Sequence, residues 1–342
     1  MIRVLVVDDS ALIRRLVTEA LTEDPGIEVV GTAANGREAI TRAADLRPDA
    51  VTLDIEMPVL DGLGALREIR RREPRLPVIM FSTLTERGAS ATLEALSLGA
   101  SDYVTKPSNT GSIAEGRASI REQLVPRIKA LAGARRLVIA PARVAPRRRA
   151  EAVEAVVMGC STGGPDALSK MLAALPVLPV PVAVVQHMPP VFTTMFAQRL
   201  DRDSPHDVME AADGDAFVSG RVLLAPGDHH LRLERSASGD VAACLDQGPQ
   251  VNFCRPAVDA LFRSAADMYG GRVLAVVLTG MGQDGLEGCR VLRDQGAGVL
   301  VQDEASSVVW GMPGAVAAAG LADEIVPLDA LADRVVAALS RC

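Results

Sequence analysis

The most constraining feature of this sequence is its regular alternation of short, almost wholly apolar runs with amphipathic stretches. In the first third of the chain, apolar runs occupy residues 3–9, 27–33, 49–55, 76–82 and 100–106. Each run is apolar along nearly its whole length, as expected of a strand that is buried on both faces. The intervening stretches, such as 10–24 and 35–48, predict helices, and a final helix is expected over 113–132. The pattern therefore predicts a parallel sheet with helices on both faces.

The same alternation resumes at Val153 and predicts a second α/β domain. Apolar runs lie at 152–159, 181–188, 221–233, 271–280 and 297–303, with a hairpin-like section after the third run. Helices are expected at 165–175, 189–202, 256–268, 284–295 and from Leu328 onwards. Because 342 residues exceed one ordinary compact domain, we expect two doubly wound parallel-sheet domains, at 1–132 and 153–342. Residues 133–152 hold six arginines, one acid and two prolines, and predict a basic interdomain linker.

The composition limits the partners and the location of the protein. A net charge of −7 and an aromatic content of 3% argue against nucleic-acid binding, which favours basic surfaces and stacking rings. The five cysteines show no C-x-x-C or His/Cys ligand spacing, which argues against a zinc site or a disulfide framework and favours a reducing compartment. No signal-peptide pattern opens the sequence, and three prolines break the longest apolar stretch. We expect a cytoplasmic protein without membrane insertion, and a monomer because no coiled-coil heptads occur.

Chemically active side chains gather at the predicted strand ends of the first domain. Asp8 and Asp9 end the first strand, Asp54 ends the third, Ser82 the fourth and Lys106 the fifth. Because the carboxyl ends of parallel strands converge on one crevice, these residues form an acidic cluster that suits Mg²⁺. Asp54 is then the candidate phosphoryl acceptor, with Lys106 neutralising the transferred group.

The segments VVDDS, LDIEMPVLDG, FSTLT and GASDYVTKP resemble the motifs of the response-regulator receiver family. The resemblance implies a flavodoxin-like receiver domain in which Asp54 accepts a phosphoryl group from a sensor histidine kinase. It implies that Mg²⁺ is held by Asp8, Asp9 and Asp54. It also implies a switch set of Ser82, Tyr103 and Lys106, with Thr83 as the alternative to Ser82.

Between a predicted strand and a predicted helix, residues 159–163 read G-C-S-T-G. This G-x-S-x-G pattern is typical of a tight turn that exposes a nucleophilic serine, here Ser161. Two other interpretations stay open. One is a phosphate-binding loop, although no G-K-[ST] follows. The other is a simple helix start, which Gly164 and Pro165 favour.

A nucleophilic serine needs a base and an acid, and two further strand ends offer them. Of the four histidines, only His187 directly follows a buried-type strand, so that it shares a sheet edge with Ser161. Asp284 follows another such strand in a glycine-rich loop, where the Met281 N–H is a candidate oxyanion donor. A lone histidine can also be purely structural. The rival acids are Asp228 and Asp303.

Over nearly the whole chain, the sequence resembles the chemotaxis-type protein-glutamate methylesterases. The resemblance rests on the segments GCSTGG, QHMPPVFTTMFAQRL, LAPGDHHL, RPAVDALF, LTGMGQDG and QDEASSVVWGMP. It implies a Rossmann-like esterase domain that hydrolyses glutamate γ-methyl esters on methylated chemoreceptors, releases methanol and deamidates certain receptor glutamines. No cofactor is implied for the ester chemistry. The implied site is a triad of Ser161, His187 and Asp284, an oxyanion contact at Met281 and support of the histidine by Thr162.

The fusion of an enzyme to a phospho-acceptor domain suggests a form of control. We expect the unphosphorylated receiver to cover the catalytic cleft, and phosphorylation to shift the population towards the open form. The alternative is a receiver-controlled binding or transcriptional domain without catalysis. Its mark would be a helix-turn-helix with basic recognition residues, and the sequence shows none after Val153.

Overall fold

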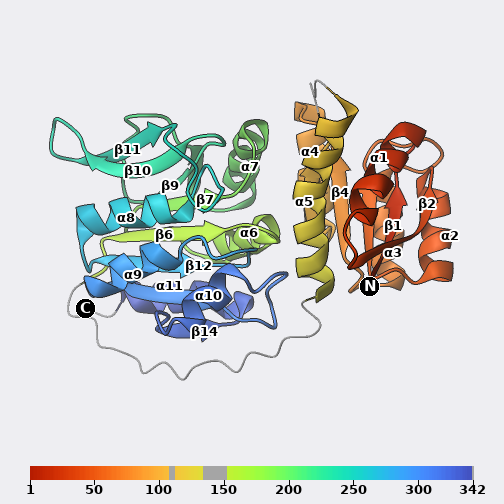
Figure 1. The fold of residues 1–342 in the computed structure, drawn as a ribbon. Coiled ribbons are helices and arrows are strands. Elements are labelled where there is room, and N and C mark those ends of the chain that lie inside the picture. The colour runs from red at the N-terminus through yellow and green to blue at the C-terminus, as the bar shows by residue number, and fades with distance from the viewer. Residues whose placement is uncertain (108–111, 134–151, 341–342) are drawn as a thin grey trace. The chain divides into compact units, whose positions relative to one another are not determined.

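A computed structural model describes residues 1–107, 112–133 and 152–340. The chain divides into two compact units, Met1–Val138 and Ile139–Cys342, which we describe separately (Figure 1). The basic linker expected at 133–152 lies outside the described residues except at its two ends. The expected domain limits therefore stay predictions.

The first unit is built on a parallel sheet, with five strands among its described residues. They are β1 (Ile2–Val7), β2 (Ile27–Ala33), β3 (Ala50–Asp54), β4 (Val78–Ser82) and β5 (Asp102–Thr105). Their order is β2-β1-β3-β4-β5, and each neighbouring pair is parallel. In this doubly wound order the ligand crevice lies beyond the carboxyl ends of β1 and β3. The expected strands and fold class of this unit are confirmed.

The helices of the first unit follow its strands through capped loops. They are α1 (Ala11–Thr22), α2 (Gly36–Leu46), α3 (Gly62–Arg72), α4 (Glu86–Ser97) and α5 (Ile113–Gly133). The first four begin after Ser10, Asn35, Asp61 and Thr85, whose side chains each accept a backbone N–H of the first turn. These bonds satisfy donors that have no partner within the helix, and so fix where each helix starts.

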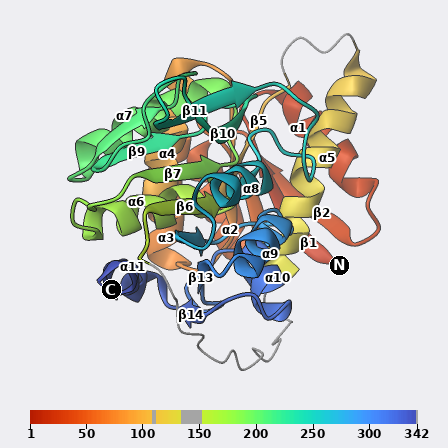
Figure 2. The ribbon, with the colours of Figure 1, turned by 90° about the vertical axis from the view of Figure 1, so that its left-hand side faces the viewer.

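The second unit contains a larger parallel sheet and a separate hairpin (Figures 1 and 2). Its strands are β6 (Ala155–Cys160), β7 (Val182–Gln186), β8 (Asp207–Glu210), β9 (Arg221–Leu224), β10 (His230–Arg235), β11 (Val241–Asp246), β12 (Val273–Val277), β13 (Gly298–Gln302) and β14 (Glu324–Val326). The sheet order is β14-β13-β12-β6-β7-β9-β8, with parallel pairs throughout. Strands β10 and β11 form the antiparallel hairpin. The doubly wound class expected for this unit is confirmed.

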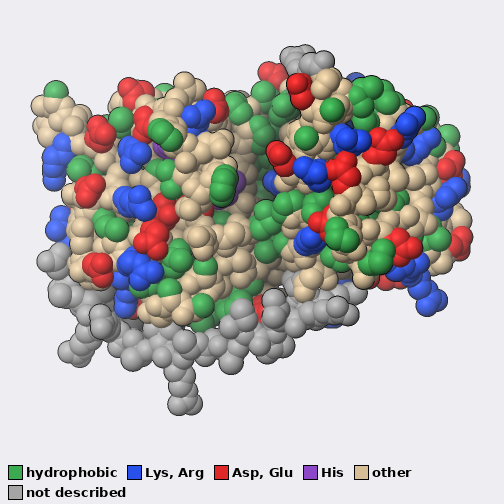
Figure 3. All heavy atoms as spheres, in the orientation of Figure 1, with side chains coloured by type: hydrophobic (Ala, Val, Ile, Leu, Met, Phe, Trp, Pro, Cys, Tyr) green, Lys and Arg blue, Asp and Glu red, His purple; other side chains and the backbone are tan. Residues whose placement is uncertain are grey.

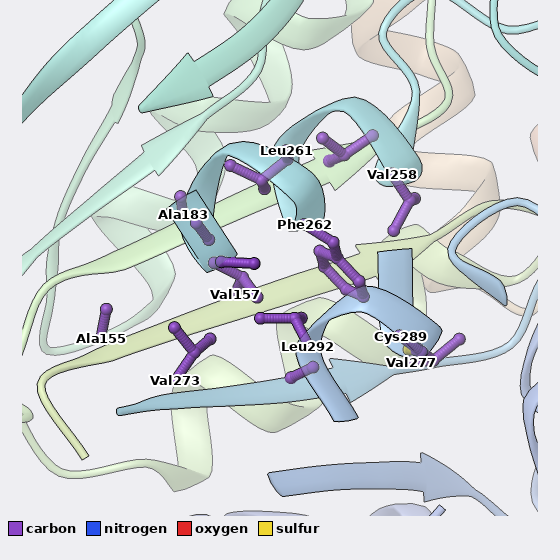
Figure 4. Packing of buried hydrophobic residues seen from close by; sticks show 14 of the residues in the cluster. Ala155, Val157, Ala183, Val258, Leu261, Phe262, Val273, Val277, Cys289 and Leu292 are labelled. Atoms are coloured by element: carbon purple, nitrogen blue, oxygen red, sulfur yellow. The ribbon is translucent and has the colours of Figure 1, made fainter. Parts of the chain in front are cut away.

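The helices of the second unit cover both faces of the sheet. They are α6 (Gly164–Ala174), α7 (Pro190–Asp203), α8 (Val258–Tyr269), α9 (Leu286–Asp294), α10 (Met312–Ala318) and α11 (Leu328–Leu339). On one face, Leu261 and Phe262 of α8 pack with Leu292 of α9 against alternate residues of the sheet, such as Val157 (Figure 4). Helix α6 contacts β6 outside this cluster, as expected of a helix on the opposite face.

Close packing at the end of β6 explains one glycine of the G-x-S-x-G turn. A Cβ atom on Gly159 would lie 2.4 Å from Val258 Cγ1, at the start of α8. Only glycine therefore lets the first turn of α8 approach the strand that leads to Ser161. This approach brings the amide groups of the α8 start towards the functional residues described below.

The structure divides one expected strand of the second unit and adds three short elements. The apolar stretch 221–233 is two strands, β9 and β10, because Pro226 and Gly227 interrupt it and Asp228 adopts a left-handed conformation with φ of 62°. Strands β8 and β14 and helix α10 were not expected. They span 4, 3 and 7 residues, which is too short for a hydrophobic period to show.

Candidate active site

Three adjacent strands of the second unit, β12, β6 and β7, end at the same edge of the sheet. Ser161 directly follows β6 and His187 directly follows β7. Asp284 lies in the loop between β12 and α9. The chain leaves β6 for β7 on one side and later occupies β12 on the other, so this edge is a topological switch point, where α/β sheets form their ligand sites.

His187 and Asp284 are directly hydrogen bonded, with 2.8 Å between His187 Nε2 and Asp284 Oδ2. Asp284 is buried, and four further groups donate to its oxygens: Asn252 Nδ2 and the backbone N–H groups of Val258, Asp259 and Gly285. Burial alone would raise the pKa of Asp284, but the hydrogen bonds, led by that from His187, lower it below its ordinary value. Asp284 is therefore ionised, and Nε2 of His187 carries the proton that it accepts.

The other ring nitrogen of His187, Nδ1, faces a side chain that the sequence did not single out. Cys254 Sγ lies 3.6 Å from His187 Nδ1. Burial alone would lower the pKa of His187, but the hydrogen bonds with Asp284 and then Cys254 outweigh it and raise the pKa above its ordinary value. Because Asp284 occupies Nε2, Nδ1 is the nitrogen that remains to take a proton from a nucleophile.

Ser161 lies in a turn that the backbone holds tightly. Its N–H donates to the Thr279 carbonyl at 3.0 Å, and its carbonyl accepts from the Gly164 N–H at 2.7 Å. Gly163 has φ of 75°, a conformation that glycine adopts without strain. Within the described residues, Ser161 Oγ makes no hydrogen bond, to His187 or to any other group. The expected hydrogen bond between Ser161 and His187 is therefore not formed in this structure. Catalytic hydrogen bonds are often long or poorly aligned in free enzymes.

Cys160, the neighbour of Ser161, is excluded as the nucleophile of this turn by its surroundings. Its side chain is fully buried, with Sγ 3.7 Å from the Val185 carbonyl oxygen. Burial raises the pKa of this thiol far above its ordinary value. Since the thiolate is the reactive form, the hydroxyl of Ser161 is the candidate nucleophile at the end of β6.

The loop of Met281 runs beside Ser161. A Cβ atom on Gly280 would lie 3.0 Å from Ser161 Cβ, so the backbone at this point touches the serine. Among the described residues, the N–H of Met281 has no hydrogen-bond partner. It is therefore free to donate to an oxyanion formed at Ser161. Thr162 is buried after Ser161, and its carbonyl accepts from Thr279 Oγ1 at 2.9 Å.

The remaining histidines and the rival acids are engaged elsewhere. His230 Nε2 contacts the Pro249 carbonyl, and its Nδ1 accepts from the Ala257 N–H, which makes it structural. Asp228 pairs with Arg255 at 2.6 Å. Asp303 accepts from the backbone and side chain of Ser306. His206 is buried near the end of α7, and His229 Nδ1 lies 3.3 Å from the Gly227 carbonyl.

The acidic cluster expected in the first unit is present at the ends of β1 and β3. Lys106 Nζ lies 2.9 Å from Asp8 Oδ2 and 2.8 Å from Asp54 Oδ1. Burial, with the charge of Asp8, raises the pKa of Asp54 to about 6 despite Lys106. Asp54 Oδ2 is buried and has no hydrogen-bond partner within the described residues. Oxygen atoms of Asp8, Asp9 and Asp54 lie within 4.8 Å of one another, so the donor set fits a hard cation such as Mg²⁺.

The expected switch residues of the first unit surround this cluster. Ser82 and Thr83 both line a pocket with Asp54 and Lys106. Ser82 Oγ is buried and donates to the Gly88 carbonyl at 3.1 Å, whereas Thr83 Oγ1 contacts Thr85 Oγ1 at 3.2 Å on the exposed side. Tyr103 is buried, and burial raises the pKa of its hydroxyl.

Comparison with known families gives the decisive observation for the second unit. The family model described as CheB methylesterase matches residues 156–335. This range is more than half of the chain and contains Ser161, His187 and Asp284. The chain belongs to the CheB methylesterase family. In this CheB-family chain, a second model, response regulator receiver domain, matches residues 4–116.

Relatives of this CheB methylesterase family member match it over nearly its full length. A protein of Nocardioides sp. is 54% identical over 99% of this chain and 96% of its own. A protein of Trichodesmium erythraeum is 48% identical over 98% of each chain. Both are named protein-glutamate methylesterase/protein-glutamine glutaminase. The crystal structure of the Thermotoga maritima CheB methylesterase catalytic domain, 41% identical, covers 55% of this chain and 99% of its own, with a TM-score of 0.53. Within the described ranges, no helix has the length and apolar character to cross a membrane.

Two groups near the CheB-type site were missed in the sequence, Asn252 and Cys254. Both lie in an irregular segment before α8 and show no period or spacing motif. Asn252 and Phe253 adopt left-handed conformations, with φ of 52° and 63°, and the Phe253 side chain is 95% exposed. The Asn252 amide donates to Asp284 Oδ1 and to Asp259 Oδ2, both at 2.9 Å. The Asn252 amide therefore lies between two buried carboxylates and hydrogen bonds to both. Burial raises the pKa of Asp259.

We expect the Asn252→Gly substitution to lower kcat/KM for ester hydrolysis by about 10- to 100-fold, because it removes a hydrogen bond to a charged group. Glycine keeps the left-handed backbone available, so the loss reports the amide itself. The measurement is methanol release at matched protein concentration. Gln247→Ala is the control, because Gln247 hydrogen bonds the outlying Asp228. Equal rates for both variants would contradict the role of Asn252.

Proposed function

We propose that this protein hydrolyses the γ-methyl esters of glutamate side chains on methylated chemoreceptors, releases methanol, and also deamidates receptor glutamines. The observation that carries the proposal is the His187–Asp284 hydrogen bond at the sheet edge that Ser161 shares. Membership of the CheB methylesterase family and the names of the relatives support it. The protein acts in the cytoplasm as the adaptation enzyme of a chemotaxis-type receptor array.

In the proposed reaction, Ser161 Oγ attacks the ester carbonyl while His187 Nδ1 takes its proton. The charge that develops on the carbonyl oxygen is stabilised by the Met281 N–H, a type of contact that lowers the barrier by about 3 kcal/mol. His187 then returns the proton to the leaving methoxide, and methanol departs. Water, deprotonated by the same nitrogen, resolves the acyl-enzyme to a glutamate carboxylate. Asp284 holds the ring and stays ionised throughout, and the ester chemistry needs no cofactor.

For the first unit, the proposal is that Asp54 accepts a phosphoryl group from a sensor histidine kinase. The match to the response regulator receiver domain supports this. A Mg²⁺ ion held by Asp8, Asp9 and Asp54 would supply neutralisation of the phosphoryl charge. Lys106, already within 2.8 Å of Asp54 Oδ1, is placed to pair with a phosphoryl oxygen. Ser82 and Tyr103 then report the phosphorylated state to the rest of the domain.

Methanol release from receptor-containing membranes tests the proposed activity. Membranes with radiolabelled methyl esters on the receptors should release labelled methanol on addition of the purified protein, and receptors with glutamine at these positions should release ammonia. If membranes are bound but no methanol is released under phosphorylating conditions, the second unit is a binding domain instead. On the visible face in Figure 3, charged groups of both signs are interspersed in each unit, which does not favour the nucleic-acid-binding alternative.

Deletion of residues 1–132 should raise the basal rate of methanol release by about tenfold or more. If the receiver covers the cleft, a shift from about 1% open to half open takes only about 2.7 kcal/mol, and deletion removes the cover altogether. The full-length Asp54→Asn variant is the control, and it should keep the low basal rate and lose its response to a phosphodonor. A truncated protein that is slower than the full chain would contradict the covering role.

A further inference from the structure

The contact between Cys254 and His187 places a sulfur and a ring nitrogen, two kinds of metal-ligand atom, side by side. Cys254 Sγ lies 3.6 Å from His187 Nδ1, on the side of the ring opposite to Asp284. Donor atoms of His187, Cys254 and Asp284 all lie within 4.8 Å of one another. His187 and Cys254 are 67 positions apart in the sequence, so no ligand spacing reveals the pair, and the expectation that the cysteines form no metal site rested on spacing alone.

We propose that His187 and Cys254 form, with Asp284, a binding site for a borderline-soft divalent ion, Zn²⁺. Bond lengths of about 2.1 Å to nitrogen and about 2.3 Å to sulfur place two ligands of a tetrahedral zinc ion about 3.6 Å apart. The separation of Nδ1 and Sγ equals this value without any movement. Water would fill the remaining coordination positions of a tetrahedral ion.

Asp284 completes the site in the way that zinc-binding histidines require. A ligating histidine donates its other ring N–H to a carboxylate, which fixes the ring and raises its basicity. Asp284 Oδ2 accepts that proton at 2.8 Å and also accepts from the Val258 N–H. The other carboxylate oxygen, Oδ1, accepts from the Asn252 amide and the N–H groups of Asp259 and Gly285. The ring of His187 is therefore oriented before any metal arrives.

The segment that carries Cys254 is also preorganised. Val251 and Cys254 exchange two backbone hydrogen bonds, of 3.1 and 2.9 Å. The next residue, Arg255, is anchored to the Asp228 carboxylate and to the Gln247 and Gly248 carbonyls. Thiolate and imidazole ligands distinguish this site from the all-oxygen cluster around Asp54, which suits Mg²⁺.

The consequence for catalysis rests on the proposed function. Zinc coordinates the Cys254 thiolate, and the thiol proton is released to solvent. The same ion occupies the lone pair of His187 Nδ1, which can then no longer take the proton of Ser161. Bound zinc therefore inhibits the esterase reversibly, and a chelator restores the activity.

The test uses the reduced full-length protein in excess Mg²⁺, with metal binding followed by calorimetry for Zn²⁺ and by absorption spectroscopy for Co²⁺. Wild type and Cys244→Ala, a control cysteine on β11, should bind one Zn²⁺ with equal affinity beyond the Mg²⁺-filled receiver. Cys254→Ala should bind it about 100-fold more weakly or worse, since loss of even an outer-shell partner costs 10- to about 100-fold. Co²⁺ should give a thiolate charge-transfer band in wild type that Cys254→Ala lacks.

Two results would overturn the site: equal Zn²⁺ affinity in wild type and Cys254→Ala, or a Co²⁺ spectrum of wild type without a thiolate band. The second result needs no variant, so it stands even if Cys254→Ala does not fold. Methanol release by the metal-free protein separates this inference from the proposed function. A metal-free protein that releases no methanol but gives the Co²⁺ band would contradict the esterase and leave the metal site intact.

Discussion

Substitution of Ser161 by alanine should abolish methanol release, with a fall in kcat of about 10⁶-fold, the scale observed when a triad serine is removed. Ser161 Oγ is the only protein atom that forms a covalent bond to the substrate in the proposed reaction. Its hydroxyl makes no hydrogen bond within the described residues, so alanine leaves the turn and its backbone contacts in place. The measurement is labelled methanol released from methylated receptor membranes.

Ser169→Ala is the matched control for this experiment. Ser169 lies in α6, on the helix that follows Ser161, and its hydroxyl donates to the Pro165 carbonyl. The control should retain the wild-type rate. A kcat for Ser161→Ala within tenfold of the wild-type value would contradict the assignment of Ser161 as the nucleophile. The Cys160 thiol is too deeply buried to replace it.

Substitution of Asp284 by asparagine should lower kcat by about 10⁴-fold, because an amide cannot hold the histidine in the required tautomer. The structure adds a second reason. Three backbone N–H groups, from Val258, Asp259 and Gly285, point at the Asp284 oxygens. An amide NH₂ at this position would face donors, so the side chain would turn or pull away from His187.

Asp228→Asn provides the comparison for Asp284→Asn. Asp228 is half exposed, pairs with Arg255 and has φ of 62°, a conformation that asparagine tolerates well. It should stay near the wild-type rate. A near-normal rate for Asp284→Asn would show that His187 needs no carboxylate, and equal losses in both variants would point to a general loss of folding.

The parts of this fold that could be predicted are those that repeat along the sequence. Strands buried on both faces, such as Val156–Met158, appear in the sequence as continuous apolar runs. An amphipathic helix, in contrast, shows polar residues from its exposed face at regular intervals. The chemistry that could be predicted follows from the same rule, because Ser161 and His187 directly follow such runs and Asp284 lies in the loop after a third.

The parts that could not be predicted depend on tertiary contacts of irregular chain. Asn252 and Cys254 reach the site because their segment is tied to the start of α8 and to Asp228, and nothing in a local pattern encodes this. Which ring nitrogen of His187 meets Asp284 was equally hidden. That choice depends on the position of Asp284 Oδ2 beside the Val258 N–H.

The segment before α8 has a consequence for the engineering of heat resistance. A left-handed residue other than glycine costs roughly 1–2 kcal/mol, and Phe253 adopts this conformation while its ring is 95% exposed. Selection for thermal stability alone would replace Phe253 with glycine and lose nothing from the packed interior. The native chain instead keeps an aromatic ring in solvent next to the residues that hold Asp284 and His187. At this position, glycine would favour thermal stability, whereas phenylalanine preserves the present shape of the rim of the site.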